Sequence, residues 1–272
     1  MHQPDQLWQR LATEVAVWVT VVSTQGSVPR DVGTWMAVFK LDVVGTVGGG
    51  RVELEAILEA RRRLADPAAG GDALLRYALG PSLGQCCGGA MQLQFELVDA
   101  ASVEMLRSRL VRGLAPVALF GGGHVGRALV QVLGQLPFAV AWIDSRDEIF
   151  PTELPSNVVA EHSDPVQQAV VALPSGSHVL IMSFSHAEDL EILAQCLRRQ
   201  REQADLGTIG LIGSKTKWAT FRRRLEQRGF SPAELQQVRC PIGIPGIIGK
   251  EPEVIAVGVA ASLLQLRNTG KP

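Results

Sequence analysis

The stretch that decides the fold is PVALFGGGHVGRALV, residues 116–130. A short apolar run leads into three glycines, and apolar residues at helical spacing follow them. Gly121, Gly123 and Gly126 make the pattern G-x-G-x-x-G between a predicted strand and a predicted helix, the context in which this pattern is specific. The first glycine permits a tight turn, the second lets a phosphate approach the backbone, and the third lets helix and strand pack closely. The stretch therefore predicts a βα unit whose helix start can bind an anion.

The residues that follow extend this unit into a parallel sheet. A strand is expected at 138–143, and Asp144 stands at its end, 18 residues beyond Gly126. An acid at this place usually binds the ribose hydroxyls of a dinucleotide. Further strands are expected at 157–160, 178–184 and 207–212, and helices at 124–135, 164–172, 187–200 and 215–228. Alternating strands and helices with short loops predict a Rossmann-like parallel sheet that is covered by helices on both faces.

His186 is a further candidate in this domain because of its place in the chain. It comes directly after the strand expected at 178–184, and ligands of open parallel sheets bind beyond the carboxyl ends of the strands. Ser185 and Glu188 also form a capping-box pattern, which gives a purely structural reason for part of this segment. His186 is therefore a cofactor-binding candidate with a structural alternative.

The N-terminal part of the chain predicts a different architecture. Strand, hairpin and helix patterns occur within residues 1–113, at 15–23, 34–47, 51–65 and 91–98. We expect a small mixed α/β N-terminal domain there, followed by the Rossmann-like domain over 114–272. The C-terminal segment 241–272 is a glycine–proline loop and then an apolar helix, and it is a candidate for packing back on the N-terminal domain.

A second glycine loop lies in the N-terminal part. Gly48, Gly49 and Gly50 join a predicted strand to a predicted helix, and Arg51 stands at the start of that helix. Consecutive backbone amides in such a turn form an anion-binding nest, and the arginine adds a positive charge. A flexible turn with a solvated arginine explains the segment equally well. Arg30, in the loop SVPRDVG, is a weaker anion-binding candidate that also suits a surface turn.

Two adjacent cysteines, Cys86 and Cys87, are followed by Gly88 and Gly89. Glycines beside a buried structural thiol are unusual because they forgo side-chain packing, so they indicate special backbone angles or the close approach of a ligand. A thiolate here could bind a soft metal such as molybdenum, or carry sulfur as a persulfide. A buried and inert thiol is the structural alternative.

Composition narrows the class of partner. The chain has 26 basic and 27 acidic residues, and its net charge of −1 gives no reason to expect nucleic acid as a partner. Its apolar runs are too short for a membrane helix, so we expect no membrane association. Residues 1–14 lack the basic and apolar regions of a secretory signal. With four cysteines and no C-x-x-C pair, the chain is expected in the cytoplasm with reduced thiols.

Seven segments together resemble the XdhC/CoxI family, whose members are accessory factors for xanthine dehydrogenase and related molybdenum hydroxylases. They occur in the family's order and cover nearly the whole chain. The segments are GSVPRDVGTWMAV, GTVGGGRVELE, LGQCCGGAMQLQFE, LFGGGHVGRALV, WIDSRDEIFP, LIGSKTKWATFRRRLEQRGF and PIGIPGIIGKEPEVIAVGVAASLL.

The resemblance implies a cofactor chaperone more than a catalyst. Such a protein binds and protects the molybdenum cofactor, a pterin dithiolene with a phosphate tail. It supports sulfuration of the cofactor with sulfur from a cysteine desulfurase, and it inserts the cofactor into apo-xanthine dehydrogenase. The family's Cys-Gly-Gly motif matches Cys87, Gly88 and Gly89, so Cys87 would face molybdenum through the cofactor, and Cys86 is an added neighbour.

The residues leave other functions open. The glycine motif and Asp144 also suit an NAD(P)-dependent oxidoreductase, and a third hypothesis is a cofactor carrier regulated by a nucleotide at the Rossmann site. The sequence does not decide whether Cys86 or Cys87 acts. An apolar first strand and an apolar C-terminal helix are compatible with a homodimer.

Overall fold

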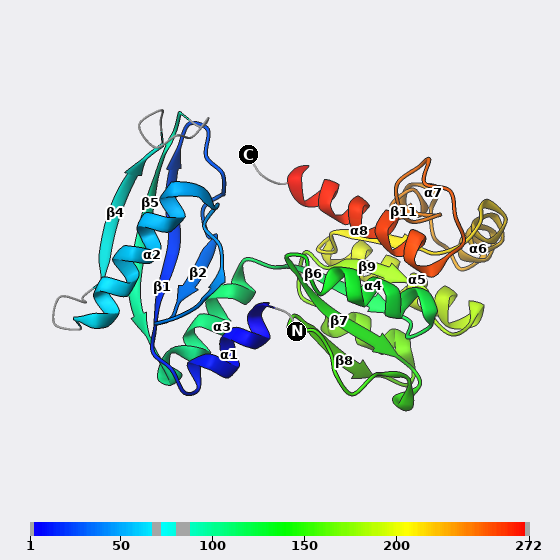
Figure 1. The fold of residues 1–272 in the computed structure, drawn as a ribbon. Helices are drawn as coiled ribbons and strands as arrows, with labels where there is room; N and C mark the ends of the chain where they lie inside the picture. The colour runs from blue at the N-terminus through cyan, green and yellow to red at the C-terminus, as the bar shows by residue number, and fades with distance from the viewer. Residues whose placement is uncertain (1–2, 67–71, 80–87, 270–272) are drawn as a thin grey trace. The chain divides into compact units, whose positions relative to one another are not determined.

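The computed structural model describes residues 3–66, 72–79 and 88–269. By its internal contacts the chain divides into two compact units, Met1–Gly113 and Leu114–Pro272 (Figure 1). Among the described residues, no helix combines the length and the apolar character that crossing a bilayer requires. Each unit is built on its own sheet.

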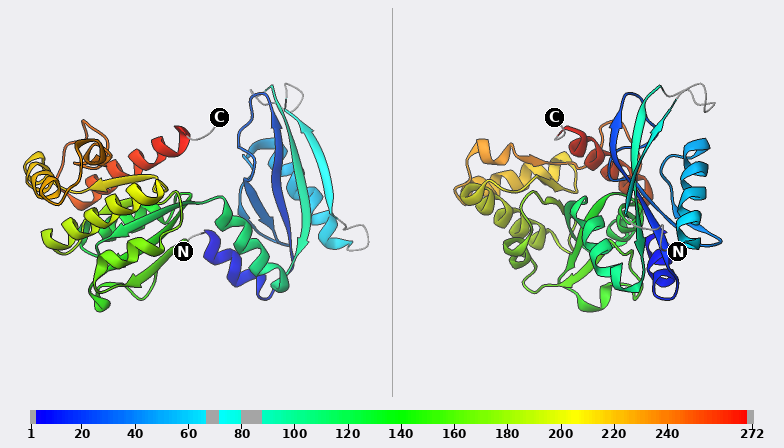
Figure 2. Two further views of the ribbon diagram at one scale, coloured as in Figure 1. Left: turned by 180° about the vertical axis from the view of Figure 1, so that it is seen from behind. Right: turned by 90° about the vertical axis from the view of Figure 1, so that its left-hand side faces the viewer.

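The first unit is a five-stranded antiparallel sheet in the order β3-β2-β1-β5-β4. Helix α2 lies along one face of this sheet (Figures 1 and 2). The elements, in chain order, are α1 (Gln3–Leu11), β1 (Ala16–Gln25), β2 (Trp35–Val38), β3 (Val43–Gly45), α2 (Gly50–Ala65), β4 (Ala73–Ala78), β5 (Ala90–Val98), η3 (Ala100–Ser102) and α3 (Val103–Arg112).

Alternation along β1 builds a separate core on each face of this sheet. Val17, Val19 and Val21 face α2 and pack in one buried cluster with its apolar side chains. Trp18 points to the other face, where it stacks on Trp35 with ring centroids 4.4 Å apart and packs in the cluster that includes α1 and α3. Each fully buried large side chain contributes roughly 1.5–3 kcal/mol. The hairpin expected over 34–47 is confirmed as β2 paired with β3.

The second unit is a six-stranded parallel sheet in the order β11-β10-β9-β6-β7-β8. With β6 counted as the first strand, this is the order 6-5-4-1-2-3 of a Rossmann fold, which confirms the predicted fold class. The elements are β6 (Ala115–Phe120), α4 (His124–Leu133), β7 (Phe138–Asp144), η4 (Asp147–Ile149), β8 (Val158–His162), η5 (Val166–Ala172), β9 (His178–Ile181), α5 (His186–Gln203), β10 (Thr208–Leu211), α6 (Lys215–Gln227), α7 (Pro232–Leu235), β11 (Val238–Arg239) and α8 (Pro252–Thr269).

Helices cover both faces of the parallel sheet (Figure 2). Side chains of η5, α5, α6 and α7 share one core with β9 and β10, and side chains of α4 and α8 share the other with β6 and β7. One difference from the sequence expectations concerns a segment of this unit. Residues 164–172 contain a 3₁₀ helix, η5, in place of an α-helix. Ala256, Val259 and Leu263 of α8 are buried in the second unit's core, where α8 packs against α4.

Candidate functional site

The glycine turn between β6 and α4 lies at the carboxyl edge of the parallel sheet. Gly121 has φ +125°, and a Cβ atom there would overlap the carbonyl oxygen of Met182. A Cβ atom on Gly126 would overlap the carbonyl oxygen of Gly121, which also accepts a 3.0 Å hydrogen bond from Trp142 Nε1. Both glycines are therefore required for the packing of this turn, as their places in the motif predict.

The first turn of α4 is open where the motif expects a ligand. Gly123 is the N-cap, no side chain caps the helix, and a Cβ atom on Gly123 would meet nothing within 4 Å. The opposite side of the helix is anchored, because Leu129, Val130 and Leu133 are buried in the second unit's core. A capless helix start that faces open space suits an anion.

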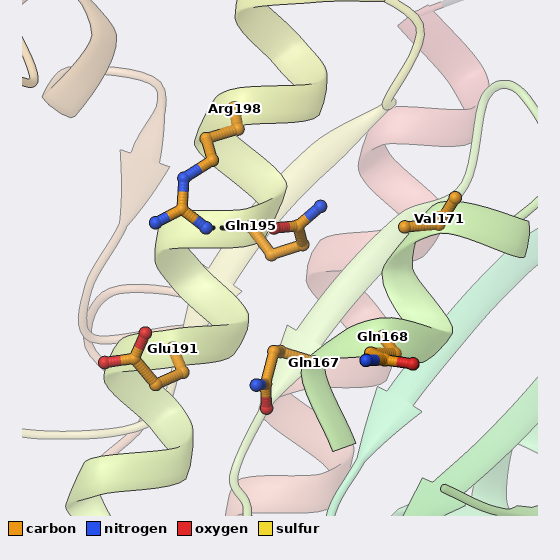
Figure 3. A pocket seen from close by; sticks show the side chains of 6 residues that line it. All are labelled: Gln167, Gln168, Val171, Glu191, Gln195 and Arg198. Atoms are coloured by element: carbon orange, nitrogen blue, oxygen red, sulfur yellow. Dashed lines mark hydrogen bonds between the residues drawn. The ribbon is translucent and has the colours of Figure 1, made fainter. Parts of the chain in front are cut away.

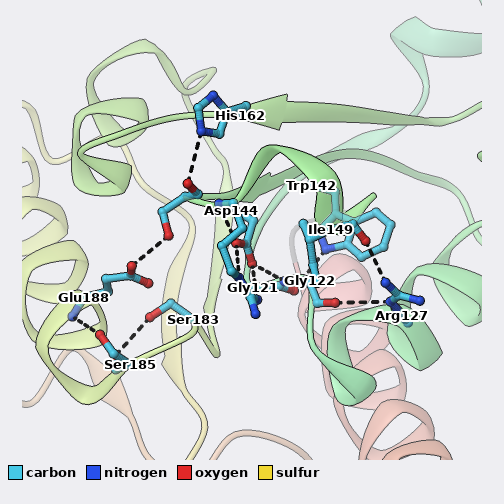
Figure 4. Close-up of polar contacts among 12 residues, drawn as sticks. Gly121, Gly122, Arg127, Trp142, Asp144, Ile149, His162, Ser183, Ser185 and Glu188 are labelled. Atoms are coloured by element: carbon cyan, nitrogen blue, oxygen red, sulfur yellow. Dashed lines mark hydrogen bonds and ion pairs between the residues drawn. The ribbon is translucent and has the colours of Figure 1, made fainter. Parts of the chain in front are cut away.

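Asp144 lies at the end of β7, as predicted, but its carboxylate is engaged within the chain (Figure 4). Its side chain is 1% exposed. Oδ2 accepts hydrogen bonds from the Gly122 amide at 2.6 Å and from Arg146 Nη2 at 2.9 Å. Oδ1 accepts from the amide and Nε of Arg146, at 2.9 and 2.8 Å. Burial disfavours the charged form, but the bonds from Arg146 and Gly122 outweigh it and lower the pKa of Asp144.

Arg146 is the partly exposed partner of the buried Asp144. Its guanidinium forms a bidentate ion pair with Asp144, which raises the pKa of Arg146. The side chain remains 35% exposed. The same guanidinium lies 4.4 Å from the ring centroid of Phe184, which follows β9 and is 65% exposed. The loops after β7 and β9 thus meet in a cation–π pair beside the glycine turn.

A second polar group links the loop after β7 to the first turn of α5 and to the end of β8 (Figure 4). Ser145 Oγ donates a 2.7 Å hydrogen bond to Glu188 Oε1, and the Ser145 carbonyl lies 3.1 Å from His162 Nε2. Ser185 caps α5 by accepting a 3.2 Å hydrogen bond from the Glu188 amide. The predicted capping pattern is thus realised in its serine half, while the Glu188 side chain turns to Ser145.

A buried ion pair stands farther along the carboxyl edge. Lys217 Nζ donates to Asp189 Oδ2 at 2.5 Å and to the Ile212 carbonyl at 2.8 Å, and the two side chains are 12% and 3% exposed. Asp189 Oδ1 accepts from both the amide and the hydroxyl of Ser183. This pair ties the loops after β9 and β10 together. The candidate His186 is exposed at the start of α5, with its ring edge-on to Phe221 at 6.1 Å.

The two described cysteines both lie in the second unit. Burial raises the pKa of Cys196 to about 12. Burial also raises the pKa of Cys240, and nearby Lys217 counters this effect only in part. Because the thiolate is the reactive form, neither group is poised for sulfur chemistry near neutral pH.

A hollow on the outer side of the second unit uses none of the predicted site residues (Figure 3). It lies between η5 and α5, and Arg198 Nη1 donates a 3.0 Å hydrogen bond to Gln195 Oε1 at its wall. Its lining residues are Gln167, Gln168, Val171, Glu191, Gln195 and Arg198.

In the first unit, the Gly48–Gly50 loop is filled by a carboxylate of the chain itself. Glu53 Oε2 accepts hydrogen bonds from the amides of Val47 and Gly49, each at 3.0 Å, and from Thr46 Oγ1 at 2.5 Å. Burial opposes ionisation of Glu53, but these bonds outweigh it and lower its pKa. A free phosphate in this nest would have to displace Glu53. Glu53 is the fourth residue after Gly49, in the first turn of α2, where an acid suits the helix dipole, but the sequence did not predict that its carboxylate fills the loop.

The same loop lies against the segment that carries Arg30. A Cβ atom on Gly48, which has φ +131°, would stand 2.6 Å from Pro29 Cγ and 3.4 Å from Arg30 Cγ. Arg30 and Arg51 are both exposed, and Arg51 Nε donates to Glu55 Oε1 at 2.9 Å. The structure therefore brings two of the motifs, and both predicted arginines, to one end of the antiparallel sheet.

The Cys-Gly-Gly motif reaches this end of the sheet through its second glycine. A Cβ atom on Gly89 would overlap the carbonyl oxygen of Gln25 and stand 2.5 Å from that of Ser27. Gly88, the residue before it, is exposed. The predicted thiols Cys86 and Cys87 lie outside the described residues. Within the described residues, no three His, Cys, Asp or Glu side chains gather to hold a metal ion.

The fold and these sites define the class: a mixed α/β domain with a cluster of glycine loops, followed in the same chain by a Rossmann-type domain. The chain belongs to the XdhC and CoxI family. The model of the XdhC Rossmann domain matches residues 117–263, and the model of the XdhC and CoxI family matches residues 9–78. The family indicated by the seven sequence segments is thereby confirmed.

Two known proteins are similar to this chain over most of its length. The uncharacterized protein YqeB of Escherichia coli (strain K12) is 29% identical over 251 residues, which cover 91% of this chain and 43% of that protein. The chain thus spans less than half the length of that curated relative. A crystal structure described as a xanthine dehydrogenase from Bacillus halodurans has a TM-score of 0.74 and 20% identity, and the match covers 100% of this chain and 97% of that one. That likeness shows a shared fold.

Proposed function

We propose that this protein binds the molybdenum cofactor and supports maturation of a xanthine dehydrogenase. Family membership supports an accessory role of this kind. The Bacillus halodurans structure that is described as a xanthine dehydrogenase shares the fold. Sulfur from a cysteine desulfurase, delivery to the apo-dehydrogenase and location in the cytoplasm are parts of the same proposal.

The observation that carries the proposal is the meeting of three motifs at one end of the antiparallel sheet. Gly48 packs on the segment with Arg30, and Gly89 packs on Gln25 and Ser27 at the start of that segment. Cys87 directly precedes Gly88 in the sequence, and we propose that its thiol acts at this end. A soft metal centre and an anionic tail need a thiolate and cations in one place, and the three motifs supply both types of group.

The thiol is assigned by comparing the four cysteines. Cys196 and Cys240 both have a raised pKa through burial, which disfavours the thiolate. The family's motif matches Cys87, and Cys86 adjoins it. We therefore assign contact with molybdenum or its sulfur to Cys87 first and to Cys86 second.

We assign the phosphate tail of the molybdenum cofactor to the cationic side chains beside the Gly48–Gly50 loop. The amides of Val47 and Gly49 already donate to Glu53, so these donors are not open to a phosphate. Arg30 and Arg51 are exposed near the loop, and guanidinium groups bind phosphate through charge-assisted hydrogen bonds.

Activation of apo-xanthine dehydrogenase by cofactor-loaded protein tests this function. We expect Cys87→Ala to lower the dehydrogenase activity recovered, with a smaller loss for Cys86→Ala. Cys240→Ala is the matched control, because this thiol lies in the other unit, and full activity is expected for it. Equal activation by all three variants and the unaltered protein would contradict the assignment of the thiol.

A further inference from the structure

The adenosine end of a Rossmann ligand has a defined place in the second unit. In a sheet of this order, a dinucleotide lies across the carboxyl ends of the strands at the switch point, with its pyrophosphate at the glycine turn and its adenosine ribose over the end of the second strand. That second strand is β7, which ends in Asp144. The loop after β9 flanks the same turn from the other side, since β7 and β9 are the two neighbours of β6.

Asp144 is already fully hydrogen-bonded. A carboxylate offers about four lone-pair positions. Two N–H groups of the backbone, from Gly122 and Arg146, and two of the Arg146 guanidinium donate to its two oxygens at 2.6–2.9 Å. The side chain is also almost completely buried. The usual acceptor for the two ribose hydroxyls of NAD is therefore taken up by the chain itself.

At this end of the site, the cationic guanidinium of Arg146 lies over the aromatic ring of Phe184. A guanidinium has five N–H donors, and the ion pair with Asp144 uses Nε and one of those on Nη2. The guanidinium stacks 4.4 Å from the ring centroid of Phe184, which leaves most of its surface exposed in a loop. Planar guanidinium and aromatic faces stack on nucleobases, and guanidinium donors bind phosphate bidentately.

We propose that the Rossmann site of this protein selects adenosine nucleotides that carry a phosphate monoester on the ribose, as NADP(H) does at its 2′ position. Arg146 binds that phosphate, Phe184 and the guanidinium contact the adenine, and the open start of α4 at Gly123 binds the 5′-phosphate. A free ribose diol finds no vacant acceptor on Asp144. This specificity goes beyond the proposed function and does not depend on it.

Three small probes separate the possible sources of the phosphate. Calorimetric titration of the full chain at low salt with 5′-AMP, 2′,5′-ADP and 3′,5′-ADP compares no ribose phosphate with the NADP type and the coenzyme A type. We expect a ribose monophosphate to bind at least about tenfold more tightly than 5′-AMP. Tighter binding of 2′,5′-ADP identifies the NADP type, and tighter binding of 3′,5′-ADP identifies the coenzyme A type.

Variants assign the preference to Arg146. Arg146→Gln should remove the gap between the best ribose phosphate and 5′-AMP, and Phe184→Ala should weaken all three probes while keeping the gap. Arg198→Gln, on the outer side of α5, is the matched control and should bind as the unaltered protein does. Because Arg146→Gln leaves Asp144 short of partners, thermal unfolding verifies its fold, and Phe184→Ala and the unaltered protein test the proposal without it. Equal affinity of the unaltered protein for all three probes, or no binding at millimolar concentration, would overturn the proposal.

Discussion

The amide of Gly122 and the carboxylate of Asp144 are joined by a 2.6 Å hydrogen bond, although 22 residues separate them in the chain. The bond fixes the turn before α4 to the end of β7. A charge-assisted bond of this kind in a buried place is stronger than a neutral one. Asp144, the acid that the motif assigns to a ligand, therefore holds the turn before α4 in place.

Replacing Asp144 with asparagine should destabilise the second unit. The NH2 group of asparagine replaces one carboxylate oxygen and cannot accept the two hydrogen bonds that this oxygen receives, so the free energy of unfolding should fall by about 1–3 kcal/mol at pH 7. Urea unfolding of both proteins measures this loss. Since the pKa of Asp144 is lowered in the fold, its contribution is complete above the unfolded pKa and is lost as the pH falls through the folded pKa. The two proteins should therefore converge in stability as the solution is acidified, and a difference that grows with acid would contradict this account.

Because the Glu53 carboxylate fills the Gly48–Gly50 loop, we expect Glu53→Gln to have a local effect there. Loss of the carboxylate weakens the bonds from Val47 and Gly49, so these amides should exchange their hydrogens faster by a factor that corresponds to about 1–2 kcal/mol. Hydrogen exchange followed by NMR measures it. Since the pKa of Glu53 is lowered in the fold, the protection is present above its unfolded pKa and should disappear as the pH falls through the folded pKa.

Glu55→Gln is the matched control for that experiment. Glu55 stands in the same helix and pairs with Arg51 in an exposed ion pair, which is worth between about 0 and 1 kcal/mol. We expect unchanged exchange at Val47 and Gly49. Equal effects of the two variants would mean that Glu53 does not hold the loop.

Alanine substitutions at Gly121 and Gly123 should distinguish a glycine that the fold requires from one that faces the ligand. Gly121→Ala places a Cβ atom against the Met182 carbonyl at a φ that L-residues rarely adopt, so a loss of about 3 kcal/mol or more in stability is expected. Gly123→Ala meets open space at φ −68° and should lose about 1 kcal/mol or less. Thermal unfolding compares the two. If Gly123→Ala were as unstable as Gly121→Ala, the helix start would not be open as described.

The buried pair of Asp189 and Lys217 should behave as a unit. Asp189→Leu alone leaves a buried ammonium without its counter-charge and should cost about 3–5 kcal/mol. The double variant Asp189→Leu with Lys217→Met should recover a large part of that loss, because no charge then stays buried. Chemical unfolding of the two single variants and the double variant gives the coupling. Additive losses would show that the pair is not coupled.

Much of the second unit could be predicted because its signals are local. Strand, glycine turn, helix and acid follow one another within 116–144, and each obeys a short-range rule. Two strands were not predicted: β11, which has two residues, and β4, an edge strand of six residues with an exposed Leu74. β11 is too short to show a pattern, and an apolar residue on the exposed face of β4 hides the alternation of that strand.

The sequence predicted where these residues lie in the fold, but not the hydrogen bonds that they make. Asp144 and Gly48–Gly50 lie where the sequence places them, but their partners, Arg146 and Glu53, give no distinct signal of their own. An arginine two residues after the acid and a glutamate in the first turn of a helix are ordinary in sequence. Only the folded structure shows that these side chains make hydrogen bonds to the groups that were expected to bind a ligand.

The most direct test of the central claim is whether this chain carries molybdenum and pterin together. The purified protein is mixed with molybdenum cofactor and separated by gel filtration, and both components are measured in the protein peak. We predict stoichiometric molybdenum and pterin with the unaltered chain, and marked loss of both with Cys87→Ala. A protein peak free of molybdenum and pterin, from a chain that is shown to be folded, would contradict the proposed function.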